Sequence, residues 1–166
     1  MRFAPAAAAL SLALAMTASI TVGQTRDPDP RAGVLIAQGQ SALRAGDTQG
    51  AIDAFESALA VDPGYTPTLV YLAEAARADD LQGKAISYYR EALARDPHNI
   101  AAIAGEGEAL AEKGALAKAR LNLAKVQSMC GDSCSETREL AAAIAQGPRA
   151  PVLTAEANIQ PQPQTN

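Results

Sequence analysis

The middle of this chain repeats itself every 34 residues. Residues of similar size and character recur at that spacing in several separate columns. The columns are Gly46, Asp80 and Gly114; Ala51, Ala85 and Ala119; Phe55, Tyr89 and Leu123; Ala58, Ala92 and Val126; and Pro63 and Pro97. A fixed period of this length is typical of helical hairpins that stack side by side. Such stacks present extended surfaces for binding partners rather than catalytic clefts.

Composition limits the size and the partners of this stack. The 166 residues are 48% hydrophobic but only 4% aromatic, without tryptophan, so we expect one small domain with a core of alanine and leucine. The formal net charge is −4. A chain with this acidic balance lacks the basic face that nucleic acid requires. We therefore expect neither nucleic acid nor an anionic membrane surface as a partner.

Residues 1–23 are typical of an export signal. Arg2 supplies a positive charge, residues 4–20 form an uncharged apolar stretch, and small residues precede the polar Gln24. Heavy use of alanine and arginine indicates a bacterium with a GC-rich genome, so the expected destination is the periplasm. A polar linker, residues 24–31, follows the signal. The alternative is an uncleaved anchor in the inner membrane, since about 17 to 19 apolar residues can just span a bilayer.

Start and stop signals divide the rest of the chain into helices. Asp29 before Pro30 and Thr66 before Pro67 each place a capping side chain ahead of a proline at the first helical position. Asn99 can cap a third helix in the same way. The expected helix pairs are at about 30–45 and 48–61, 66–79 and 81–95, and 100–112 and 115–129.

A seventh helix is expected at about 135–146, after the last pair. Leu140 and Ile144 lie at helical spacing on one face of this segment, and Glu136 is left for water. A stack needs such a capping helix because its last hairpin would otherwise expose an apolar face. Residues 147–166 are rich in proline and have no periodic apolar pattern, which predicts a disordered tail.

The second repeat carries the fullest pattern of large, small and proline positions. Its members are Leu69, Leu72, Ala73, Ala85, Ile86, Tyr89, Ala92, Leu93 and Pro97. Through them the chain resembles the tetratricopeptide repeat family over residues 32–131, and the capping helix extends the likeness to residue 146. The resemblance implies an all-α, right-handed α-solenoid. Its domain would span residues 32–146, with repeats at about 32–65, 66–99 and 100–131 and a capping helix at about 135–146.

The third repeat departs most from the family pattern. Glu106 and Gln127 stand where the family favours leucine, and Gly131 stands where it favours proline. The fold that the resemblance implies therefore depends mainly on the first two repeats.

In this family, the first helices of successive repeats line a concave groove that holds a peptide or a partner helix. The resemblance places the protein-binding contacts of this chain at Gln40, Arg44, Tyr71, Glu74, Arg77 and Glu108. Tyr71 would be an aromatic anchor of the kind that interfaces favour. Some members grip a carboxyl-terminal carboxylate with Lys, Asn and Arg in this groove. This chain has Ile36, Gln40 and Tyr71 at the corresponding positions, so we do not expect that clamp.

Cys130 and Cys134 are the only cysteines, and they close a short loop before the capping helix. In an oxidising compartment, such a pair is expected to form a structural disulfide. A metal site lacks ligands because the sole histidine, His98, lies a full repeat away. No phosphate-binding Gly-Lys-Ser/Thr loop, Gly-x-Ser-x-Gly elbow or His-Glu-x-x-His pair occurs. We therefore expect no enzyme activity, no metal and no cofactor.

Together, these features predict an exported, non-catalytic scaffold of the bacterial periplasm that holds a protein or peptide partner. We expect a monomer or a weak homo-oligomer, without stable membrane insertion once the signal is removed. Two alternatives stay open. One is a thiol-disulfide redox protein that uses Cys130 and Cys134, and the other is a structural subunit of an envelope assembly for secretion, pilus formation or cytochrome maturation.

Overall fold

The structure is a computed structural model that describes residues 26–149. Within that range the chain forms seven α-helices and no β-strand. The helices are α1 (Pro30–Arg44), α2 (Thr48–Val61), α3 (Pro67–Ala78), α4 (Gln82–Arg95), α5 (Ile100–Glu112), α6 (Leu116–Cys130) and α7 (Ser135–Gln146). The predicted all-α fold is confirmed, and every helix begins and ends within one residue of its predicted bounds.

The two ends of the chain carry predictions that the structure does not reach. The predicted signal peptide, residues 1–23, and the part of the predicted tail beyond Arg149 lie outside the described residues. Among the helices of residues 26–149, none combines the length and the apolar character needed to cross a membrane.

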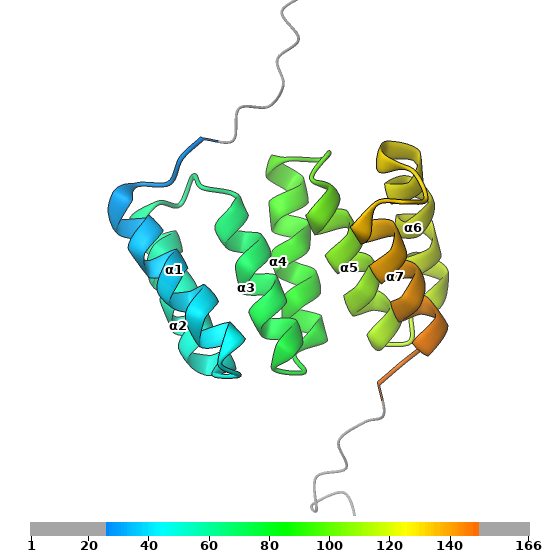
Figure 1. Cartoon of the computed structure of the whole chain (residues 1–166), viewed down its shortest axis with the longest axis horizontal. Coiled ribbons are helices and arrows are strands. Elements are labelled where there is room, and N and C mark those ends of the chain that lie inside the picture. Colours follow the sequence, from blue (N-terminus) through cyan, green and yellow to red (C-terminus); the bar gives the residue numbers. More distant parts are fainter. Residues whose placement is uncertain (1–25, 150–166) are drawn as a thin grey trace, which may run out of the picture.

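The first six helices pair into hairpins that stand side by side in chain order (Figure 1). Helix α1 packs on α2, α3 on α4 and α5 on α6, and successive hairpins meet through α2 with α3 and α4 with α5. Contacts of α3 with α1 and α5, and of α5 with α7, form an inner layer of α1, α3, α5 and α7. Helices α2, α4 and α6 form the outer layer. The arrangement is the predicted solenoid of helical hairpins.

Helix α7 closes the end of the stack, where it contacts both α5 and α6 (Figure 1). Its Leu140 is fully buried beside Ile103 of α5 and Val126 of α6. The apolar face of the last hairpin is therefore covered, and the predicted capping role of this helix is confirmed.

The turns inside the hairpins explain the first column of the repeat. Gly46, Asp80 and Gly114 all adopt positive φ angles, of 82°, 58° and 86°. The backbone amide that follows each of them donates to a carbonyl five residues earlier, as in Leu81 N to Ala76 O at 2.8 Å. This is the Schellman ending of a helix, whose left-handed residue is usually glycine. Asp80 is the only residue other than glycine with positive φ in the described range.

Of the three predicted helix N-caps, Asp29, Thr66 and Asn99, two are confirmed. The Asp29 side chain accepts from the Arg31 amide, and the Asn99 side chain accepts from the Ala102 amide. The predicted cap at Thr66 is wrong, because its side chain makes no capping hydrogen bond. An N-cap residue needs a non-helical backbone, whereas Thr66 already has helical angles of −52° and −36°.

Small side chains let the helices approach closely. Ala51, Ala85 and Ala119 are each fully buried, and Phe55 and Tyr89 are the largest fully buried side chains of the described residues. A Cβ atom on Gly39 would come within 2.5 Å of the Phe55 ring. These contacts show that small residues bring the helices of a hairpin together and that the aromatic column fills the space between hairpins.

Candidate binding groove

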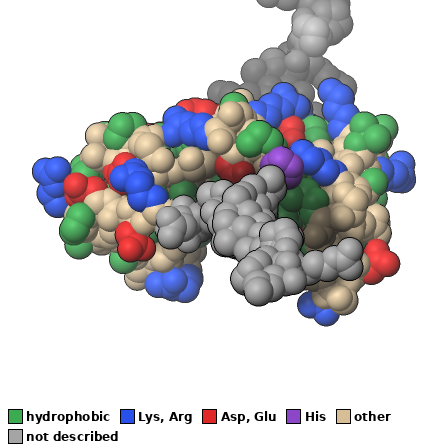
Figure 2. Space-filling view, turned by 90° about the horizontal axis from the view of Figure 1, so that it is seen from above, with side chains coloured by type: hydrophobic (Ala, Val, Ile, Leu, Met, Phe, Trp, Pro, Cys, Tyr) green, Lys and Arg blue, Asp and Glu red, His purple; other side chains and the backbone are tan. Residues whose placement is uncertain are grey.

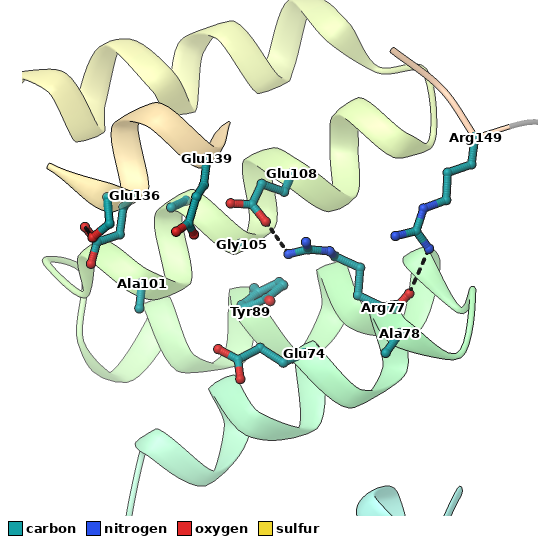
Figure 3. Close-up of a pocket in the computed structure, with 12 residues that line it drawn as sticks. Glu74, Arg77, Ala78, Tyr89, Ala101, Gly105, Glu108, Glu136, Glu139 and Arg149 are labelled. Atoms are coloured by element: carbon teal, nitrogen blue, oxygen red, sulfur yellow. Dashed lines mark hydrogen bonds and ion pairs between the residues drawn. The ribbon is translucent and has the colours of Figure 1, made fainter. Parts of the chain in front are cut away.

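A pocket of about 460 Å³ opens on the inner layer between α3, α5 and α7. Figure 3 shows that side chains from these three helices point into it, with Tyr89 of α4 between α3 and α5 and Arg149 at the far edge. On the face that Figure 2 shows, acidic and basic side chains are mixed rather than gathered on one side. The pocket is thus the place where the inner layer offers room for a ligand.

The pocket lies over the third repeat because one column of the repeat changes from a large to a small residue. Tyr71 of α3 stacks on Phe55, with ring centroids 5.5 Å apart. One period later, Tyr89 takes the place of Phe55 and Gly105 takes the place of Tyr71. A Cβ atom on Gly105 would lie only 2.3 Å from Cζ of Tyr89. The side chain that fills the inner layer at the second repeat is therefore missing at the third.

Arg77 crosses the pocket and is already paired within the chain. It forms ion pairs with Glu108 and, at 3.1 Å, with Glu112. Burial raises the pKa of Glu108, and the neighbouring Arg77 only partly opposes that shift. Burial alone would lower the pKa of Arg77, but Glu108, Tyr89 and Glu112 together outweigh burial and leave that pKa raised. Arg77 therefore stays positively charged and links α3 to α5 through these ion pairs.

Three further glutamates face the pocket. Partial burial raises the pKa of Glu74, although the residue as a whole is exposed. Glu136 has a lowered pKa because its own backbone amide, in the first turn of α7, and the Ser135 hydroxyl stabilise the carboxylate. Glu139 completes the α7 wall. No Lys or Arg of residues 26–149 lies within 4.0 Å of any of these three carboxylates.

Arg149 holds the end of the described chain against the same face. Its backbone amide donates to the Glu112 carbonyl at 3.0 Å. Its guanidinium pairs with Asp80 at 2.6 Å and with Glu112 at 3.1 Å. Arg149 belongs to the segment predicted as the tail, residues 147–166, and it lies against α5 and the turn before α4.

The predicted contact residues divide into two groups. Glu74, Arg77 and Glu108 line the pocket together. Gln40, Arg44 and Tyr71 do not line it: Arg44 is exposed in the last turn of α1, and Gln40 lies beside Tyr71 at the second repeat. The sequence reasoning missed Gly105, Glu139 and Arg149. Gly105 could have been found from its column, since Ala37, Tyr71 and Gly105 share one register position.

The cysteine pair joins the pocket wall to the third hairpin. Cys130, the last residue of α6, is bonded in a disulfide to Cys134, which precedes α7. Oγ1 of the buried Thr137 lies 3.1 Å from Sγ of Cys134 and donates to the Gly131 carbonyl at 2.8 Å. The disulfide therefore positions the first turn of α7, which carries Glu136. Both sulfur atoms are used in this bond, so the cluster of Cys130, Cys134 and Glu136 offers a metal only one carboxylate.

The stacked hairpins, the repeated left-handed turns and the capping helix define an α-solenoid repeat protein. Residues 36–100 match the family model described as "Tetratricopeptide repeat". This part of the chain is similar to the tetratricopeptide repeat family, in line with the resemblance that its second repeat carries.

Solved structures of tetratricopeptide repeat domains have the same fold. The Sgt2 domain from Aspergillus fumigatus matches with a TM-score of 0.65 and 23% identity, over 84% of this chain and 89% of that one. The TPR2B domain of yeast Sti1, in complex with pHsp70, matches with a TM-score of 0.65 and 18% identity, over 71% of this chain and 96% of that one. The Yersinia enterocolitica type III secretion chaperone SycD, in complex with a peptide of the translocator YopD, matches with a TM-score of 0.59 and 20% identity. The match covers 69% of this chain and 86% of that one. No curated protein matches the chain.

Proposed function

We propose that this protein is a non-catalytic scaffold that holds a protein or peptide partner on its inner layer. The observation that carries the proposal is the pocket between α3, α5 and α7, which opens on the surface shared by successive repeats. Structural neighbours support it, since the Sti1 and SycD domains are each seen in a complex with a partner or a partner peptide. Extended surfaces of this type are what stacked repeats use for binding.

The setting that we propose is the bacterial periplasm. The basis is the segment of residues 1–23, with Arg2 followed by an uncharged apolar stretch. A disulfide between Cys130 and Cys134 fits an oxidising compartment, where it braces the start of α7. Intact-mass measurement of the native protein tests this setting, because a species that retains Arg2 would contradict export with cleavage.

Site-specific photocrosslinking tests the binding proposal. A benzophenone amino acid at Ala101, which is exposed at the pocket edge, should capture a partner in the native cell envelope. The same probe at Leu121, 71% exposed on α6 of the outer layer, is the matched control. Capture that is specific to position 101, and that is lost when the exposed pocket residue Ala78 is replaced by Arg to block the pocket, supports the proposal. Equal capture from both positions would contradict it.

A further inference from the structure

The pocket on the inner layer carries more negative charge than its own arginines neutralise. Its lining includes four glutamates, Glu74, Glu108, Glu136 and Glu139, but only two arginines. Both arginines are already occupied, since Arg77 pairs with Glu108 and Glu112 and Arg149 pairs with Asp80 and Glu112. The charge that remains available to a ligand in the described structure is therefore carboxylate.

The pocket also has apolar walls next to these carboxylates. Ala78 lies on the α3 side, and Ala101 and Ala104 lie on the α5 side. Gly105 lines the pocket without adding a side chain to it. A ligand that fits this lining has an apolar stem several atoms long and a positively charged head. Lysine and arginine side chains have this combination, because they bury their methylene groups while keeping the charge solvated.

We propose that the pocket receives a lysine or arginine side chain from an extended segment of the partner protein, with its charge between Glu74 and Glu139. These two carboxylates come from opposite walls, α3 and α7, and both point into the pocket (Figure 3). The inference rests on the proposed function, because it names the chemistry of the partner at the same site.

The electrostatics of the pocket favour a cation over an anion. Burial raises the pKa of both Glu74 and Glu108, so their charges are held at a cost that an incoming positive group would reduce. An incoming carboxylate would instead meet Glu74, Glu136 and Glu139 without a free arginine to pair with. The HSP90 peptide bound by the first TPR of Spaghetti (RPAP3), SRMEEVD, is acidic at its end. The pocket of this chain thus selects the opposite charge.

Short peptides that differ in one residue test the inference directly. The probes are acetylated and amidated peptides Gly-Ser-X-Ser-Gly, with X as Arg, Lys, norleucine or Glu, titrated into ¹⁵N-labelled protein and followed by amide chemical shifts. We expect the Arg and Lys peptides to shift residues of α3, α5 and the first turns of α7, with roughly tenfold weaker binding by the norleucine and Glu peptides. Raising the salt concentration to about 0.5 M should lower the affinity of the Arg and Lys peptides, because exposed charges are then screened.

Charge-removing variants identify the carboxylates that act. Glu74→Gln and Glu139→Gln should each weaken binding of the Arg peptide by about two- to fivefold, the effect expected for one partly exposed charge pair. Asp53→Asn is the matched control, because Asp53 is an exposed acid on α2 in the outer layer. This control should leave the affinity unchanged while removing the same unit of charge.

Several outcomes would overturn the inference. They are equal binding of the Arg and Glu peptides, shifts centred on the outer layer, the same loss in Asp53→Asn as in Glu74→Gln, and no saturable shift with any probe. Failure here remains distinct from failure of the proposed function. If a partner is still captured from position 101 in the Glu74→Gln and Glu139→Gln proteins, the pocket binds a partner by other chemistry, and only the charge selection is wrong.

Discussion

Replacing Gly105 by alanine should destabilise the fold, although alanine is the better helix former. The added Cβ would lie 2.3 Å from Cζ of Tyr89 and 2.5 Å from its hydroxyl oxygen. The ring cannot easily move away, because Tyr89 is only 1% exposed and packs in the main core cluster. Overpacking of this kind costs about 1 to 3 kcal/mol. The gain in helix propensity is about 1 kcal/mol, so the net loss should be about 0 to 2 kcal/mol.

Gly33→Ala in α1 provides the control for propensity alone. The nearest atom to a Cβ there is Cγ of Pro28 at 3.7 Å, which is an ordinary contact. This variant should therefore be more stable than the parent by up to about 1 kcal/mol. Urea unfolding followed by far-ultraviolet circular dichroism measures both variants. A gap of about 1 to 3 kcal/mol between them is the overpacking at Tyr89.

A double-mutant cycle with Tyr89→Leu separates this clash from a general effect on α5. Without the ring, Gly105→Ala should become neutral or stabilising, which corresponds to a coupling energy of about 1 to 3 kcal/mol, within the range measured for touching residues. Two other results are an equal cost of Gly105→Ala in both backgrounds and a stabilised parent, as with Gly33→Ala. Either result would refute the packing that opens the pocket.

Four further changes test other parts of the structure, each by urea unfolding. Gly114→Ala should cost about 1 to 2 kcal/mol, because Gly114 has a φ of 86° in its helix-ending turn. Cys130→Ala with Cys134→Ala should cost at most about 2 kcal/mol, since the closed loop is short, and intact mass should show two hydrogens fewer in the native parent than after reduction. Arg77→Met should cost about 1 to 3 kcal/mol, because it leaves the carboxylate of Glu108 buried without its partner. Glu74→Gln should raise stability at pH 7 but not near pH 4: burial raises the folded-state pKa of Glu74, so the parent loses stability as pH rises from the unfolded pKa of about 4.3 through that folded value.

The helices and their order were predictable because residues of the same type recur at equivalent positions in the three repeats. The column of Gly46, Asp80 and Gly114 marks left-handed turns, and the column of Phe55 and Tyr89 marks the space between hairpins. Because equivalent positions in successive repeats have the same structural requirement, one departing residue does not obscure the pattern. The fold was therefore readable from the spacing, the helix start and stop signals and the resemblance that they support.

The pocket was harder to predict because it depends on where repeats differ. Positions shared with the family identified Glu74, Arg77 and Glu108, but a shared pattern cannot show that Arg77 is already paired with Glu108 and Glu112. Glu139 contributes from a helix that has no counterpart in the repeat. Arg149 lies in a segment without periodicity, so its ion pair with Asp80, 69 positions earlier in the sequence, leaves no local signal.

Helix α5 carries one departure of the third repeat from the family pattern and also forms one wall of the pocket. Gly105 makes room for Tyr89, and Gly107 makes room for Leu140 of the cap, to which a Cβ atom would come within 2.8 Å. Glu106, between them, stands where the family favours leucine and instead binds Arg90 and Asn122. Two glycines inside a helix cost about 1 kcal/mol each relative to alanine, a loss that the burial of Leu140 and Tyr89 offsets. Helix α5 thus lacks a side chain at two positions that face neighbouring side chains, and the pocket lies beside it on the inner layer.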